Sequence, residues 1–158
     1  MKLYKRIGDK MHYWETWDIS NRKGAIHKGV VGQRGEYKEV SSGLFSSFRK
    51  EIQNEVTKYS ADGYQEIDSD DHITLLIEYT VDGMGTPEDV EKRTRLQERM
   101  NETLGWTGLG HCDGGSIGSG TMEVCCFVVD FDIAKSVIEQ DLKDTEFSNY
   151  TRIFDENA

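Results

Sequence analysis

A short acidic run, IDSDD at residues 67–71, separates two stretches with different apolar patterns. This division limits the possible folds of the chain most strongly, because each stretch must fold around a core of its own. Each stretch has the length of a small domain and must build its core from a few short elements. The sequence of 158 residues therefore predicts two domains, at residues 1–67 and 72–158.

The first stretch consists of short strand-like segments, separated by turn residues such as GDK, SNRKG and GQRG. The expected strands are 2–7, 12–19, 25–31 and 36–40. A helix is expected over residues 46–59, where apolar side chains recur at helical spacing. These are Phe48, Ile52, Val56 and Tyr59. Gly63 supplies the helix stop. Trp14 and Trp17 must point to opposite faces of their strand, so one of the two is expected in the core.

The second stretch predicts strands and helices in the order β-α-β-β-α-β, an α+β pattern typical of the ferredoxin-like sandwich. A buried strand over 72–81 precedes a helix that starts at Pro87, has Thr86 as its N-cap and ends near Leu104. The later elements are a strand over 122–130, a helix over 133–142 capped by Asp132, and a strand over 150–154. This order requires that the glycine-rich run before residue 122 joins two strands.

That glycine-rich run, TGLGHCDGGSIGSG at residues 107–120, favours a β-hairpin with Asp113-Gly114-Gly115 at its tight turn. It contains no lysine or arginine, and it matches neither GxxxxGK[ST] nor GxGxxG, two common phosphate-binding patterns. Glycines and hydroxyls of such a run can also form a surface for a ligand or partner. The residues predicted for that surface are His111, Asp113, Ser116, Ser119 and Thr121.

The three cysteines, Cys112, Cys125 and Cys126, do not make a disulfide framework, and no metal-ligand spacing such as CxxC or HExxH occurs. The sequence predicts buried, reduced thiols, and neither a metal nor a cofactor. A small enzyme using His111 or Cys112 stays an alternative. Consecutive side chains on extended backbone diverge, however, so these two do not form a catalytic pair by themselves.

Charge is distributed unevenly along the chain. Residues 1–67 hold twelve Lys/Arg against nine Asp/Glu, whereas residues 68–158 hold seven against twenty, and the whole chain has a net charge of −10. The acidic half argues against coating of DNA or of an anionic membrane by the whole molecule, and it suits a basic protein partner. Without a signal peptide or a span of about 18 apolar residues, the expected location is the cytoplasm. The oligomeric state stays open.

The segment from about Tyr13 to Ile67 resembles the WGR domain, a small sheet-plus-helix module of bacterial proteins and poly(ADP-ribose) polymerases. The resemblance rests on YWETW, HKGVVGQRGEYKEV and ADGYQEI, in which Gly29, Gly32 and Gly35 match the glycines of the family motif. Lys28 stands in place of the motif tryptophan and Val30 in place of its arginine. The whole chain is also similar to small bacterial proteins that pair this module with a second half. The three motif glycines are expected in turns that need positive φ.

Two functions are predicted, the first from the uneven charge and the absence of a catalytic constellation, and the second from the resemblance. The first is a non-enzymatic regulatory or adaptor protein, which docks a protein partner through the WGR-like half and the acidic half; an immunity-type inhibitor is one form of it. The alternative is nucleic-acid binding, because the motif tryptophan and arginine of nucleic-acid-binding members are expected to meet DNA. Four basic residues around the altered motif could grip phosphates instead. These are Lys23, Lys28, Arg34 and Lys38.

Overall fold

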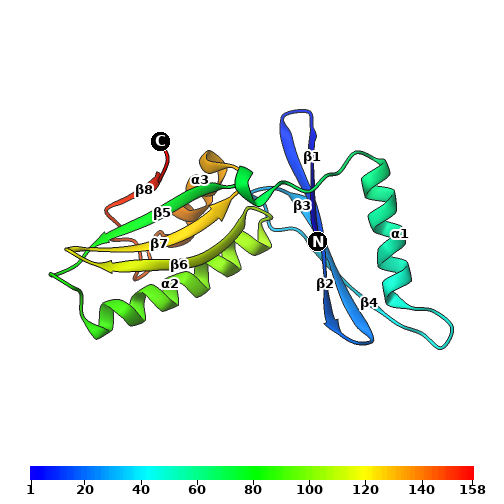
Figure 1. The fold of residues 1–158 in the computed structure, drawn as a ribbon, viewed down its shortest axis with the longest axis horizontal. Helices are drawn as coiled ribbons and strands as arrows, with labels where there is room; N and C mark the ends of the chain where they lie inside the picture. The colour runs from blue at the N-terminus through cyan, green and yellow to red at the C-terminus, as the bar shows by residue number, and fades with distance from the viewer. The chain divides into compact units, whose positions relative to one another are not determined.

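Two antiparallel four-stranded sheets and three α-helices make up the mixed α+β structure, a computed structural model that describes residues 1–158 (Figure 1). The chain divides into two units, Met1–Asp68 and Ser69–Ala158, each with one sheet. The division falls inside the acidic run 67–71, and a short 3-10 helix, Ser69–Asp71, opens the second unit.

The sheet of the first unit is a meander, with strand order β1-β2-β3-β4. Its strands are β1 (Lys2–Ile7), β2 (Lys10–Ser20), β3 (Lys23–Val30) and β4 (Glu36–Ser41), and α1 (Phe48–Ala61) follows them. After α1 the chain returns to the sheet, where Gln65 bridges to Tyr4 beside β1. All four predicted strands and the predicted helix are therefore confirmed, with ends shifted by at most two residues.

The core of the first unit lies between the sheet and α1. Its buried residues are Leu3, Trp14, Ile26, Val40, Phe48, Ile52 and Tyr64. Gly24 on β3 lets the helix approach closely, because a Cβ at this position would lie 2.7 Å from Ile52 Cδ1. The helix ends at the C-cap Asp62, and Gly63 turns the chain with φ of +91°. The prediction for the two tryptophans is confirmed: Trp14 is buried in this core, and Trp17 is exposed.

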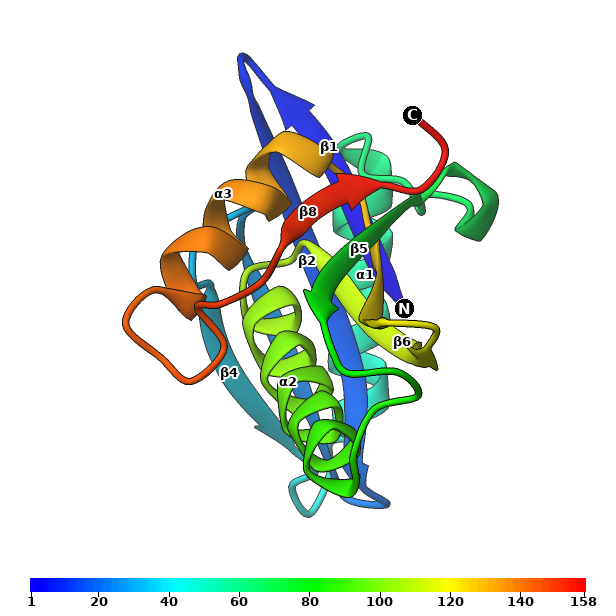
Figure 2. The ribbon, with the colours of Figure 1, turned by 90° about the vertical axis from the view of Figure 1, so that its left-hand side faces the viewer.

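The second unit follows the predicted β-α-β-β-α-β order, and its strand order is β6-β7-β5-β8. The elements are β5 (Ile73–Thr80), α2 (Pro87–Trp106), β6 (Gly110–Gly118), β7 (Thr121–Val128), α3 (Phe131–Leu142) and β8 (Arg152–Asp155). Figure 2 shows α2 and α3 on the same side of this sheet. Every second residue of β7 is buried, from Met122 to Val128, so one face of the sheet packs against the helices.

Helix α2 begins as predicted, with Thr86 as N-cap and Pro87 as its first residue. The Thr86 hydroxyl accepts from the Asp89 N–H, and the Asp89 carboxylate accepts from the Thr86 N–H. For α3 the predicted cap is wrong: Asp130 rather than Asp132 accepts from the N–H of Ile133, at 3.0 Å. The helix starts earlier than predicted, at Phe131.

The glycine-rich run does join two strands, but the predicted turn position is wrong. Residues 110–118 are strand β6, and the hairpin turns at Ser119 and Gly120, which have φ of +53° and +89°. Cys112 pairs with Cys126 and Gly115 with Val124, so Asp113 and Gly114 both stand opposite Cys125. The Asp-Gly pair therefore forms a β-bulge within the strand and not the turn.

Candidate functional site

A pocket of about 400 Å³ lies in the first unit, where β2, the β3–β4 connection and the end of α1 meet. Its lining combines basic, aromatic and glycine residues with one carboxylate. The lining residues are His12, Tyr13, Lys28, Gly29, Val30, Gln33, Arg34, Gly35, Glu36, Tyr59 and Tyr64. Because much of this lining comes from residues 28–36, the segment in which Lys28 and Arg34 were predicted as binding residues, the pocket is the strongest candidate for a functional site.

Glycines allow the backbone around the pocket to pack closely. The N–H of Gln33 donates to the carbonyl of Val30 at 3.0 Å, and Gly32 has φ of +88°, as a turn glycine should. Gly29 and Gly35 do not adopt positive φ, so that prediction is wrong for them. They are needed for space: a Cβ on Gly29 would lie 2.9 Å from Gly35 Cα, and one on Gly35 would lie 2.6 Å from the carbonyl oxygen of Lys28.

Positive charge enters the pocket from Lys28, at the end of β3, and Arg34, in the β3–β4 connection. Lys28 Nζ donates to Tyr59 Oη at 3.4 Å, and this hydrogen bond is the largest cause that raises the pKa of Lys28. The ammonium group is therefore charged at neutral pH. Glu36 brings one carboxylate to the same rim.

Tyrosines form the wall of the pocket beside α1. Tyr59 stacks on the core residue Trp14, with ring centroids 5.4 Å apart and an interplanar angle of 28°. Tyr64 meets Tyr59 edge-on, at 4.9 Å and 88°. Burial raises the pKa of Tyr64, so its phenol stays neutral. The wall is thus held in place by ring packing against the core.

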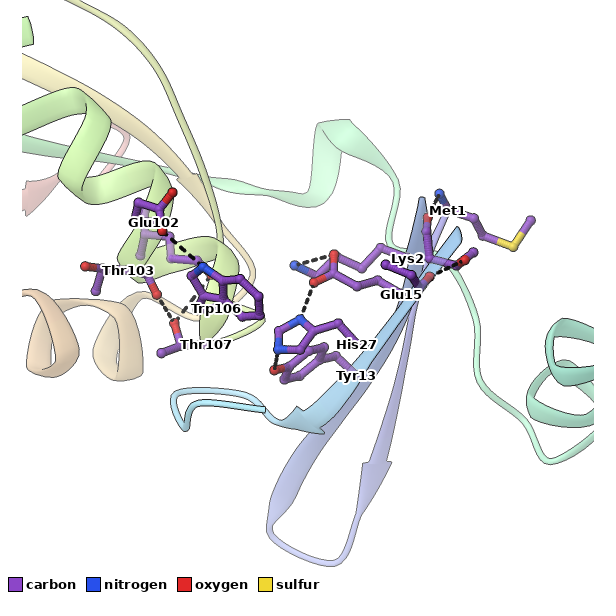
Figure 3. A network of polar contacts seen from close by, with 12 residues as sticks. Met1, Lys2, Tyr13, Glu15, His27, Glu102, Thr103, Trp106 and Thr107 are labelled. Atoms are coloured by element: carbon purple, nitrogen blue, oxygen red, sulfur yellow. Dashed lines mark hydrogen bonds and ion pairs between the residues drawn. The ribbon is translucent and has the colours of Figure 1, made fainter. Parts of the chain in front are cut away.

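A chain of polar contacts fixes Tyr13, which lines the pocket from β2 (Figure 3). Tyr13 Oη and His27 Nε2 share a hydrogen bond of 3.0 Å, and the other ring nitrogen of His27 lies 2.7 Å from Glu15 Oε1. Lys2 Nζ lies 3.4 Å from the second oxygen of Glu15. Burial is the main cause that raises the pKa of Tyr13, and the charge of Glu15 adds to it. Tyr13 is therefore a neutral phenol with a fixed orientation.

The pocket includes two of the four basic residues predicted to bind nucleic acid or a partner. Lys28 and Arg34 line it. Lys23 Nζ lies 2.6 Å from Glu39 on the neighbouring strand, and Lys38 Nζ lies 3.3 Å from Glu51 on α1. Lys23 and Lys38 therefore point to carboxylates of their own unit and do not line the pocket.

The residues predicted for the second binding surface are spread along the β6–β7 hairpin. His111 packs against Phe127 with ring centroids 5.6 Å apart, and Asp113 lies in the bulge. Ser116 Oγ donates to Glu123 Oε2 at 3.1 Å, while Ser119 lies at the opposite end, in the turn. Thr121 starts β7. The structure does not bring these five residues together, because the run is an extended strand.

Three tyrosines and a histidine of the pocket, His12, Tyr13, Tyr59 and Tyr64, were not predicted as site residues. For two of them the sequence gives a weak indication: Tyr59 occupies the apolar face of a predicted helix, and Tyr64 follows the glycine that ends it. Both positions are equally typical of core residues. Only the packing of α1 on the sheet brings them beside Lys28.

No cluster of three or more His, Cys, Asp or Glu residues is placed to hold a metal ion. None of the helices, including the 20-residue α2, is both long and apolar enough for a membrane span. Comparisons with protein-family models, with curated proteins and with solved structures each found no match.

Proposed function

We propose that the protein is a non-enzymatic binding protein, with a WGR-like unit at Met1–Asp68 and a ferredoxin-like unit at Ser69–Ala158. The first assignment is supported by the sheet followed by one helix, and by the return of the chain through Gly63 and Tyr64 to the edge of β1. The second is supported by the strand order β6-β7-β5-β8 with both helices on one face.

The partner that the first unit suits best is a nucleic acid, and the pocket is the observation that carries this proposal. Lys28 and Arg34 supply cations for phosphate oxygens, and the rings of Tyr59 and Tyr64 border the same pocket. Stacking on aromatic rings and phosphate contacts are the two main sources of sequence-tolerant binding to single strands. Lys28 thus provides charge where the resemblance expects a tryptophan, and Tyr59, which is only partly buried, provides the aromatic surface.

This proposal predicts a salt-dependent affinity that depends on the pocket. With a labelled single-stranded oligonucleotide, fluorescence anisotropy should show binding at about 50 mM salt that weakens steeply by about 200 mM. The double variant Lys28→Gln/Arg34→Gln should bind more weakly. A plot of log K against log salt concentration has a negative slope, and in the variant this slope should be less steep by about 1.4, since each lost phosphate contact contributes about 0.7.

The matched control is Lys23→Gln/Lys38→Gln, which removes the same charge from the same unit but outside the pocket. It should keep most of the affinity. If both double variants weaken binding equally, net charge and not the pocket determines binding. If the wild-type protein does not bind at about 50 mM salt, the nucleic-acid assignment is wrong.

A basic protein is the second candidate partner, and the charge pairing of the second unit favours it. Three of its seven cations are neutralised within the unit: Arg95 pairs with Glu146 at 3.0 Å, Arg99 with Asp141 at 2.8 Å, and Arg152 with Glu78 at 2.9 Å. Most carboxylates therefore have no cation of their own unit beside them, which supports docking to a basic cleft, as an immunity-type inhibitor would do. For any basic partner recovered from the source cells, Glu91→Gln/Glu98→Gln should raise Kd and Lys28→Gln/Arg34→Gln should not.

A further inference from the structure

Cys112 and Cys126 face one another across the β6–β7 hairpin. They are direct register partners of an antiparallel pair, so both side chains lie on the same face of the sheet. Such partners have Cα atoms about 4.5–5.5 Å apart, within the range of about 4.4–6.8 Å that disulfides span. The two positions therefore meet the backbone requirement for a cross-strand disulfide.

The thiols are directed toward each other as well. Cys112 Sγ donates to the carbonyl oxygen of Cys125 at 3.1 Å, so it points across to β7 beside the Cys126 backbone. The Cys112 side chain is the largest cause that raises the pKa of Cys126, and burial adds to it, as expected for two neighbouring buried thiols. Cys125 is different: it stands opposite the bulge and has no register partner on β6, and its own side chain lies on the opposite face of β7.

A small oxidant reaches Cys112 more easily than it reaches Cys126. β6 is an edge strand, and the bulge at Asp113 and Gly114 interrupts its pairing immediately after Cys112. The Cys112 N–H donates to the side chain of Asn101 on α2, at 2.8 Å. Edge strands with interrupted pairing open locally at low free-energy cost. Cys126 is fully buried on the central strand β7, whereas Cys112 is 5% exposed.

We propose that Cys112 and Cys126 are a redox pair that forms a reversible cross-strand disulfide when a peroxide oxidises the protein. The Cys112 thiolate attacks one oxygen of hydrogen peroxide, the O–O bond breaks, and the thiol becomes a sulfenic acid while hydroxide takes up a proton as water. The Cys126 thiol then attacks the sulfenic sulfur, the S–S bond forms, and a second water leaves with the Cys126 proton. Two electrons pass from the thiols to the peroxide, which is reduced to two waters. This pair is independent of the function proposed for the pocket.

The test uses the full chain with Cys125→Ser, which leaves the proposed pair as its two cysteines. The reduced protein is treated with hydrogen peroxide, remaining thiols are blocked with N-ethylmaleimide, and the protein is cleaved after glutamate. Cleavage after Glu123 separates Cys112 from Cys126, whereas residues 100–134 contain no lysine or arginine for trypsin to cut. We expect two peptides joined without maleimide, lighter by two hydrogen atoms than their sum and released by dithiothreitol.

Two results would overturn the proposal. The first is that both cysteines take up maleimide after the folded protein is treated, although the urea-unfolded protein oxidises under the same conditions. The second is that wild-type protein links Cys125 instead, within one chain or between two. Cys112→Ser and Cys126→Ala are the controls, and each should abolish the linked peptides. Circular dichroism of Cys125→Ser verifies that the tested protein is folded.

Discussion

Replacing Trp14 with alanine is expected to lower the free energy of unfolding by about 3–5 kcal/mol, the cost of deleting a large aromatic side chain from a core. Trp14 is fully buried among the core residues of the first unit and stacks on Tyr59 of α1. Its removal leaves a cavity at the contact between sheet and helix. Urea unfolding of the full chain, followed by circular dichroism, measures the loss.

Trp17→Ala is the matched control, because the same residue type is removed from the same strand, three positions away. Trp17 is 40% exposed and contacts Tyr37 at a ring-centroid distance of 6.0 Å. We expect a loss of less than half that of Trp14→Ala. Equal losses would mean that α1 does not pack on the Trp14 face of β2. Because Trp14 Nε1 has no hydrogen-bond partner, Trp14→Phe breaks no hydrogen bond and should cost less than alanine.

The parts of the fold that could be predicted from sequence are those with local causes. Helical spacing places Phe48 and Ile52 in a core before any tertiary contact is known, and strand alternation places one of Trp14 and Trp17 there without choosing between them. Thr86 and Pro87 mark the start of α2 because capping depends on residues within one turn. The order of strands and helices follows from these local signals, so both units could be outlined correctly.

The sequence-based predictions are wrong where two nearby positions suit the same turn or the same helix cap about equally well. Asp113-Gly114 and Ser119-Gly120 both suit a tight turn, since each offers a glycine in the left-handed region. The pairing of β6 with β7 decides between them, because its register places both Asp113 and Gly114 opposite the single residue Cys125, which makes a bulge. For α3, Asp130 and Asp132 are both good N-caps, and the tertiary position of the helix selects the first.

The candidate site could be predicted only in part, because its residues come from separate elements. Lys28 and Arg34 were found from their position in an altered motif. Lys23 and Lys38 are also basic residues near this segment, so the sequence does not distinguish them from Lys28 and Arg34. Only the structure shows that they lie beside Glu39 on the neighbouring strand and Glu51 on α1. The tyrosine wall depends on the packing of α1 against the sheet, which no short stretch of sequence encodes.

Gly35→Ala is expected to disrupt the pocket and to destabilise the first unit. An added Cβ would lie 2.6 Å from the carbonyl oxygen of Lys28 and 2.7 Å from His27 Nε2, and it would overlap Tyr13 Oη. Tyr13 and His27 are held by the buried chain of hydrogen bonds to Glu15, so neither can move without breaking it. Overpacking of this kind costs about 1–3 kcal/mol, and oligonucleotide affinity should fall with it because Lys28 is displaced.

Gly105→Ala provides the control for the glycine-to-alanine change itself. Gly105 lies within α2, and a Cβ there would meet no atom within 4 Å. Alanine should therefore raise the free energy of unfolding, by up to about 1 kcal/mol, through its helix propensity, and it should leave oligonucleotide binding unchanged. If Gly35→Ala instead unfolds like the wild type and keeps its affinity, the β3–β4 connection does not pack on Tyr13. Loss of affinity with unchanged stability would separate the two roles: the close packing of Gly35 would shape the pocket without supporting the core.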